Sequence, residues 1–191
     1  MKKALLVLAG LLVTAAAQGA PTISDMIVSQ QQMLMRGAVE VAALPWKVGD
    51  ENNYNIDMGF LKGTMNMKVR EISDEGIWLD QNVDLGFAGK QVINVLVDQN
   101  TGEVKKMIVN GREQQPPKAG NMQIVEQKED KITVPAGTFQ VIYLKILNKD
   151  DNTQIETWVN PRDIPISGMA KTIQPAQFGK VTLVLTSFKK N

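Results

Sequence analysis

The sequence predicts a mainly β protein, an antiparallel meander curled into an open or closed barrel, with one N-terminal amphipathic helix packed in or across it. Apolar residues recur at helical spacing between residues 22 and 43. From about residue 50 to 188 they alternate with polar residues, as a strand with one buried face requires. Short segments rich in Gly, Asn and Asp separate the alternating runs and predict turns between strands.

Residues 1–20 have the layout of a signal peptide. Lys2 and Lys3 precede the apolar run ALLVLAGLLVTAAA, and Ala15 and Ala17 form a small-residue cleavage motif. The run is shorter than the roughly 20 apolar residues of a transmembrane helix. We therefore expect export to the periplasm or beyond, with no membrane span after cleavage and residues 21–191 forming a single β-rich domain.

The predicted helix covers about residues 22–43. Thr22 or Ser24 can cap its start, and Pro45 prevents its continuation. One apolar face is expected, made of Ile23, Met26, Ile27, Met33 and Leu34.

Eleven strand-like runs follow the helix. The Asn110-Gly111 pair is the strongest hairpin signal among the turns, because a type I′ turn needs positive φ at both central residues. The runs span residues 52–60, 63–72, 76–85, 89–98, 103–109, 112–115, 121–134, 138–148, 153–160, 168–174 and 179–188.

Composition narrows the possible functions. The 21 basic and 20 acidic residues are scattered, whereas nucleic-acid binding needs a clustered basic face. The chain has no His and no Cys, which excludes Ser-His-Asp and Cys-His catalysis, ordinary zinc sites, disulfides and lipid attachment to cysteine. The stretch that begins at Asp98 fails as a calcium loop, because Val109 stands where the closing Glu is required. We expect no catalytic residues, no metal and no cofactor.

Four blocks of sequence carry a family resemblance. They are LPWKVGDENNYNIDMGFLKGTMNMKV from Leu44, ITVPAGTFQVIYLKI from Ile132, ETWVNPRDIPISGMAKTI from Glu156 and GKVTLVLTSF from Gly179. In this order they resemble a family of uncharacterised bacterial periplasmic β-proteins, known as a domain of unknown function. The resemblance covers about residues 44–188. It implies a fold similar in style to the half-barrels of lipoprotein carriers and to lipocalins, without an established enzymatic activity.

Methionine supplies the candidate ligand site. Met is the side chain that adapts best to irregular apolar shapes, and it lines two neighbouring predicted strands. A curved sheet covered by the helix would hold a lipid or another apolar ligand on its concave face. The residues expected to line that site are Met26, Met33, Tyr54, Met58, Met65, Met67 and Trp158.

A second hypothesis needs no ligand. The protein is then a structural or protein-interaction module of the cell envelope, whose methionines fill a packed core. Arg162 and Asp163, in the loop NPRDIPISG, are the candidate contacts for a protein partner, because two prolines keep this loop out of the hydrogen-bond ladder. The two hypotheses differ in whether the methionines face a cavity or solid packing.

Overall fold

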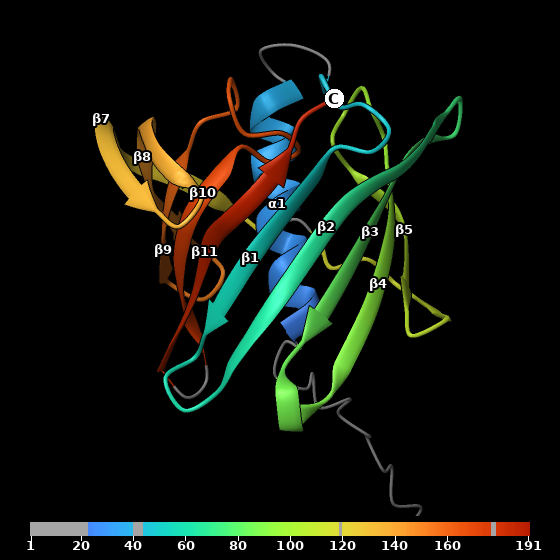
Figure 1. Ribbon diagram of the computed structural model, residues 1–191, viewed down its shortest axis with the longest axis horizontal. Coiled ribbons are helices and arrows are strands. Elements are labelled where there is room, and N and C mark those ends of the chain that lie inside the picture. The colour runs from blue at the N-terminus through green and yellow to red at the C-terminus, as the bar shows by residue number, and fades with distance from the viewer. Residues whose placement is uncertain (1–22, 40–43, 119, 177–178) are drawn as a thin grey trace, which may run out of the picture.

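The computed structural model describes residues 23–39, 44–118, 120–176 and 179–191. The predicted signal peptide lies outside these residues. One α-helix and one short 3₁₀ helix accompany eleven strands (Figure 1). In chain order the elements are α1 (Ile23–Val39), β1 (Glu51–Asp57), β2 (Lys62–Ser73), β3 (Gly76–Asp84), η1 (Gly86–Ala88), β4 (Lys90–Val97), β5 (Val104–Val109), β6 (Arg112–Gln114), β7 (Met122–Val134), β8 (Gly137–Asn148), β9 (Thr153–Val159), β10 (Met169–Ala176) and β11 (Gly179–Lys189).

The strands form one antiparallel sheet in the order β6-β5-β4-β3-β2-β1-β11-β10-β9-β8-β7. From β1 the chain runs outward to one edge, β6, then resumes at the opposite edge, β7, and returns to pair β11 with β1. Two consecutive strands, β6 and β7, are therefore the edges. The sheet is an open half-barrel, and we call the gap between its edges the seam.

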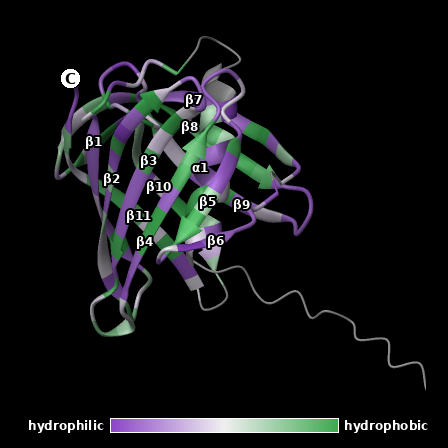
Figure 2. Ribbon diagram, turned by 90° about the vertical axis from the view of Figure 1, so that its right-hand side faces the viewer, coloured by the Kyte–Doolittle hydropathy of each residue, from purple (hydrophilic) through white to green (hydrophobic). Residues whose placement is uncertain are grey.

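Each predicted strand is present, because alternation and turn chemistry agree along this part of the chain. Figure 2 shows hydrophobic and hydrophilic residues alternating along the strands. Asn110 and Gly111 join β5 to β6 with φ values of 51° and 77°, as the predicted type I′ turn requires.

Helix α1 lies on the concave side of the sheet (Figure 1). Its side chains from Ser24 to Arg36 are all buried or half-buried. The most buried face agrees with the predicted one at Ile27 and differs at Met26, Met33 and Leu34, which are only half-buried. The curved sheet meets the helix on several sides, so burial does not follow apolar spacing alone. The buried positions of that face are Ser24, Ile27, Val28, Gln31 and Met35.

Buried glutamines join the helix to the sheet. The Gln31 amide nitrogen donates to the Gln81 side-chain oxygen at 3.3 Å, and the Gln81 nitrogen donates back at 2.8 Å. Gln31 also donates to the Met67 sulfur at 3.3 Å. On the other side of the helix, the Gln30 amide donates to the Thr172 hydroxyl. These bonds attach α1 to β2 and β3 on one side and to β10 on the other.

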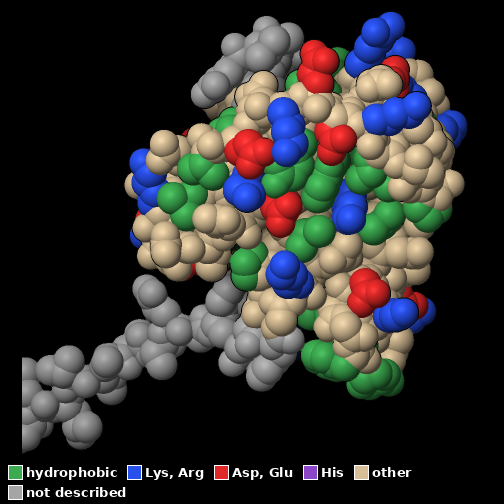
Figure 3. Space-filling model, turned by 90° about the vertical axis from the view of Figure 1, so that its left-hand side faces the viewer, with side chains coloured by type: hydrophobic (Ala, Val, Ile, Leu, Met, Phe, Trp, Pro, Cys, Tyr) green, Lys and Arg blue, Asp and Glu red, His purple; other side chains and the backbone are tan. Residues whose placement is uncertain are grey.

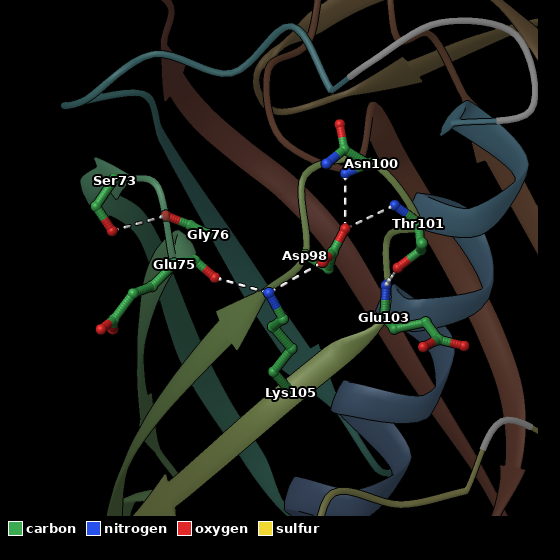
Figure 4. A network of polar contacts seen from close by, with 8 residues as sticks. All are labelled: Ser73, Glu75, Gly76, Asp98, Asn100, Thr101, Glu103 and Lys105. Carbon is green, nitrogen blue, oxygen red and sulfur yellow. Dashed lines mark hydrogen bonds and ion pairs between the residues drawn. The ribbon is translucent and has the colours of Figure 1, made fainter.

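The turn between β4 and β5 contacts the C-terminal end of the helix. The Asp98 carboxylate accepts hydrogen bonds from the backbone N–H groups of Asn100 and Thr101 (Figure 4). The Lys105 ammonium lies 3.0 Å from Asp98 and donates to the Glu75 carbonyl oxygen at 2.9 Å. Glu103 and Arg36 of α1 form an ion pair of 2.5 Å. This stretch, which fails as a calcium loop in the sequence, is an ordered turn that contacts the helix.

Candidate functional site

The predicted ligand residues on β1 and β2 are buried, and Tyr54 and Met65 also line a hollow of about 440 Å³ together with residues of β3, β4 and β11. Tyr54, Met65 and Met67 are at most 1% exposed. The Tyr54 hydroxyl donates to the Met169 carbonyl oxygen at 3.1 Å and accepts from the Asn52 amide at 3.0 Å. Burial raises the pKa of this hydroxyl. Met58 is half-buried and packs against the same core. Helix α1 covers this part of the sheet.

Trp158 is partly buried and packs against the same core as Met58. Its ring lies 5.1 Å from that of Tyr143, centroid to centroid, and its indole nitrogen donates to Asp130 on β7 at 3.0 Å. The Lys171 ammonium lies 5.0 Å from the centre of the Trp158 ring. Burial and a hydrogen bond to Glu156 raise the pKa of Tyr143 to about 12. None of these ring and polar partners of Trp158 is a predicted methionine.

Arg162 and Asp163 lie in the loop between β9 and β10. The Arg162 side chain is 93% exposed, and its backbone carbonyl accepts a hydrogen bond from Lys190. Asp163 accepts from the Asn160 amide at 2.7 Å. The loop is fixed by these bonds, and the Arg162 side chain points into solvent.

A cleft of about 680 Å³ opens beside the N-terminal half of α1. It is lined by α1, the segment that leads into β7, the β8–β9 turn, β9 and the end of β10, and it lies on the β7 side of the seam. We call it the seam cleft. Its apolar lining residues are Met26, Met122, Ile155, Pro175 and Ala176, and its other lining residues are Asp25, Ser29, Gln30, Lys118, Gly120, Asn148, Asp150, Asp151, Thr153 and Gln174.

Two of the three acidic residues that line the seam cleft, Asp150 and Asp151, lie in or beside the turn between β8 and β9. Asp150 accepts a hydrogen bond from the backbone N–H of Asn121 at 2.9 Å. Asp151 accepts from the backbone N–H of Thr153 at 3.0 Å and from its hydroxyl at 2.6 Å. These bonds fix the two carboxylates. Of the other lining residues, Ile155, Gln30 and Gln174 are buried, and Met26 and Met122 are half-buried. The arrangement fits an apolar chain inside the cleft and a neutral or cationic group at its rim.

The site predicted from sequence and the seam cleft share one residue, Met26. Met33, one predicted partner of Met26 on α1, does not line the cleft. Met122, Ile155 and Ala176 line the cleft without having been predicted. Met122 and Ile155 are apolar residues of predicted strands, and Ala176 lies just beyond one.

Within the described ranges, no group of three or more acidic residues is placed to hold a metal ion. The helix that the structure describes is too short and too polar to cross a membrane.

Comparisons of sequence find no relative. No family model matches the chain, and no curated protein matches it. The resemblance to the family of periplasmic β-proteins therefore stays a prediction.

Comparisons of structure find similar folds at low identity. CT021 from Chlamydia trachomatis is 11% identical with a TM-score of 0.51, over 85% of this chain and 92% of CT021. MucB, in a complex with MucA from Pseudomonas aeruginosa, is 11% identical with a TM-score of 0.43, over 85% of this chain and 56% of the other. A protein with a YmcC-like fold from Bacteroides fragilis is 12% identical with a TM-score of 0.40, over 78% and 99%. The chain thus has a fold like that of CT021, and the likeness concerns the fold alone.

Proposed function

We propose that the protein is a non-enzymatic binding protein of the bacterial cell envelope, located in the periplasm after export, and that it holds the apolar chain of a lipid or a similar amphiphile. The observation that carries this proposal is the seam cleft, whose interior is lined by Met26, Met122 and Ile155. The ligand expected from the sequence would lie at the middle of the concave face, which α1 fills. The proposed ligand lies beside α1, in the seam cleft.

The size and lining of the cleft support a small ligand. Its volume of about 680 Å³ lies within the roughly 300–1,000 Å³ of small-molecule sites. Each methylene group that a lipid chain buries contributes about 0.8 kcal/mol. The ligand has no need to displace the helix, because the cleft lies beside it.

The side chains of the cleft support binding without catalysis. Asp150 and Asp151 accept hydrogen bonds from nearby backbone groups, which hold them in their turns. The chain contains no His or Cys that could act as a nucleophile or a base. A lining of this kind positions a ligand and offers no activated group to it.

Two methionines of the same helix provide a matched test. Met26→Gln places an amide in the seam cleft, whereas Met33→Gln makes the same change outside it. We expect Met26→Gln to weaken the binding of a fluorescent fatty-acid analogue by several fold and Met33→Gln to leave it unchanged. Native mass spectrometry of gently purified protein should find an apolar molecule that Met26→Gln loses.

A filling variant separates lost contact from lost stability. Ala176→Trp should occupy the cleft and also weaken binding, while urea unfolding reports whether each variant keeps its stability. Equal affinities in all variants, or a wild-type protein that neither binds the probe nor carries an apolar molecule, would contradict the proposal.

The ligand-free interaction module remains a second candidate, favoured by the edge strand β7. Ile124 and Val125 on this strand are 54% and 46% exposed. The outer edge of β7 has no neighbouring strand among the described residues, so an extended segment of a partner protein could pair with it. If the protein neither binds the fatty-acid analogue nor carries an apolar molecule, the ligand-free interaction module is the better account of its function.

A further inference from the structure

Two hairpin turns at one end of the sheet share a short sequence and a local structure. Residues 57–60 read DMGF between β1 and β2, and residues 84–87 read DLGF between β3 and β4. In each turn the Asp carboxylate accepts a hydrogen bond from the backbone N–H of the Gly, at 2.8 Å in the first and 2.9 Å in the second. Both glycines have positive φ, 81° and 60°, which favours Gly at these positions.

The phenylalanine of each turn points into solvent, while a leucine of the same turn is buried. Phe60 is 71% exposed and Phe87 is 89% exposed. Leu61 and Leu85, in the same turns, are 7% and 4% exposed and belong to the core. Each turn is thus anchored by a leucine and presents an aromatic ring outward.

The two turns lie side by side, because β2 pairs with β3. A side chain placed on Gly63, at the start of β2, would lie 2.3 Å from the Asp84 carbonyl oxygen and 2.9 Å from the Leu85 side chain. Figure 3 shows hydrophobic side chains gathered at the lower end of the molecule, with acidic and basic side chains directly above them. We call this end, defined by Phe60 and Phe87, the aromatic tip.

Each turn also carries one lysine. The side chains of Lys62 and Lys90 are 77% and 78% exposed. Lys62 lies 3.9 Å from Asp57, and Lys90 lies 2.8 Å from Asp84. The four charges of the aromatic tip balance, so its attraction to other molecules is mainly apolar.

The N-terminal end of α1 lies at the same end of the molecule. The Ser24 hydroxyl donates to the Gln91 side-chain oxygen at 2.7 Å, and Gln91 follows Lys90 in β4. The first described residues therefore lie beside the aromatic tip, and the apolar run of residues 4–17 precedes them in the sequence.

We propose that the aromatic tip docks on the surface of a lipid bilayer, with Phe60 and Phe87 inserted between the head groups and Lys62 and Lys90 near the phosphates. Aromatic rings and snorkelling lysines are typical of this interface. These two rings project from neighbouring turns at one end of the sheet, so a flat surface such as a bilayer can take up both at once. The proposal does not depend on a ligand in the seam cleft.

Vesicle partitioning tests the proposal directly. The exported protein is mixed with vesicles of phosphatidylcholine, alone or with phosphatidylglycerol, and the bound fraction is measured by flotation. Phe60→Ser and Phe87→Ser should each lower the partition coefficient by about tenfold, since each removes a ring that the bilayer would take out of water. Val48→Ser is the matched control, because Val48 is 55% exposed at the opposite end of β1. Binding should change little with salt or with the anionic lipid.

Tryptophan substitutions give a second readout that does not depend on affinity. Phe60→Trp and Phe87→Trp should shift their emission to the blue on adding vesicles and be quenched by brominated lipid, whereas Val48→Trp should do neither. Circular dichroism checks that every variant is folded. Met26→Gln should partition like the wild type, which separates this proposal from the proposed ligand site.

Three results would overturn the proposal. The wild-type protein does not associate with either kind of vesicle. Alternatively, it associates and the serine variants associate equally well. Finally, the serine variants lose binding to an envelope protein while vesicle binding is absent throughout, which would assign the aromatic tip to a protein partner.

Discussion

Three consecutive glutamines, Gln30 to Gln32, lie inside the protein with exposed fractions of 2%, 3% and 5%. A buried amide without a partner loses the free energy of its bonds to water. Gln30 and Gln31 avoid this loss by bonding to Thr172 and Gln81 across the helix–sheet contact. The thioether of Met67 accepts a further hydrogen bond from Gln31, so this methionine is a packed residue with a polar contact.

The Gln31–Gln81 pair can be tested by a double-mutant cycle. Gln31→Met or Gln81→Met alone leaves one buried amide unpaired and should lower the free energy of unfolding by about 1–3 kcal/mol. The double variant replaces both amides by apolar side chains of similar shape, so it should cost less than the sum of the two. Urea unfolding measures all four proteins. A double variant that costs the full sum would show that the two amides act independently.

Asp98 gives a prediction about pH. Its hydrogen bond to Lys105 and those from the backbone N–H groups of Asn100 and Thr101 lower its pKa from 3.8 to about 2. A lowered folded-state pKa stabilises the protein above the unfolded value and stops doing so as pH falls through the folded value. The melting temperature of Asp98→Asn should therefore approach that of the wild type between about pH 4 and pH 2. In a Lys105→Gln background, Asp98→Asn should change the melting temperature by less. Melting temperatures of the wild type and Asp98→Asn that fall in parallel between about pH 4 and pH 2 would contradict this account.

At the scale of elements, the eleven strands could be predicted because each has alternating residues and is bounded by turn residues. The helix was also predictable as an element: the structure describes it from Ile23 to Val39, and residues 40–43 of the predicted span lie outside the described residues. Its buried face was not predictable, because apolar spacing treats Gln31 as a surface residue. The facing side chains of Gln81 and Met67, far away in the sequence, make that burial favourable.

The contact between α1 and the β4–β5 turn can be tested with two glycines. Gly102 and Gly111 both have positive φ, 68° and 77°. A methyl group on Gly102 would lie 2.8 Å from the Met35 carbonyl carbon and 2.9 Å from the Arg36 nitrogen, whereas one on Gly111 meets nothing within 4 Å. Both Ala variants carry the conformational cost of about 1 kcal/mol. Gly102→Ala should cost clearly more in thermal unfolding, because it also pushes α1 outward. Equal costs would show that the turn moves freely against the helix.

At the scale of the whole molecule, the seam cleft could not be predicted from the sequence, because its lining residues come from distant segments of the chain. The seam cleft combines α1, the segment that leads into β7, the β8–β9 turn and the end of β10. The segment that leads into β7 reaches this cleft because the chain passes from one edge of the sheet to the other between β6 and β7. Periodicity within a strand carries no information about that crossing. Met26 was therefore the one predicted ligand residue that lines the cleft, while Tyr54, Met65 and Met67 proved to be covered by the helix.

The same topology predicts how the protein opens. Strands β1, β2 and β11 lie at the centre of the sheet, so their amide hydrogens should exchange only on global unfolding. The edges should exchange fastest, above all β6, whose three residues are all exposed. Hydrogen-exchange mass spectrometry measures this gradient. A lipid bound in the seam cleft should slow exchange in β9, β10 and the N-terminal half of α1 and leave β2 to β4 unchanged. Protection confined to β2 to β4 would instead place the ligand away from the seam, because those strands contribute no residue to the cleft.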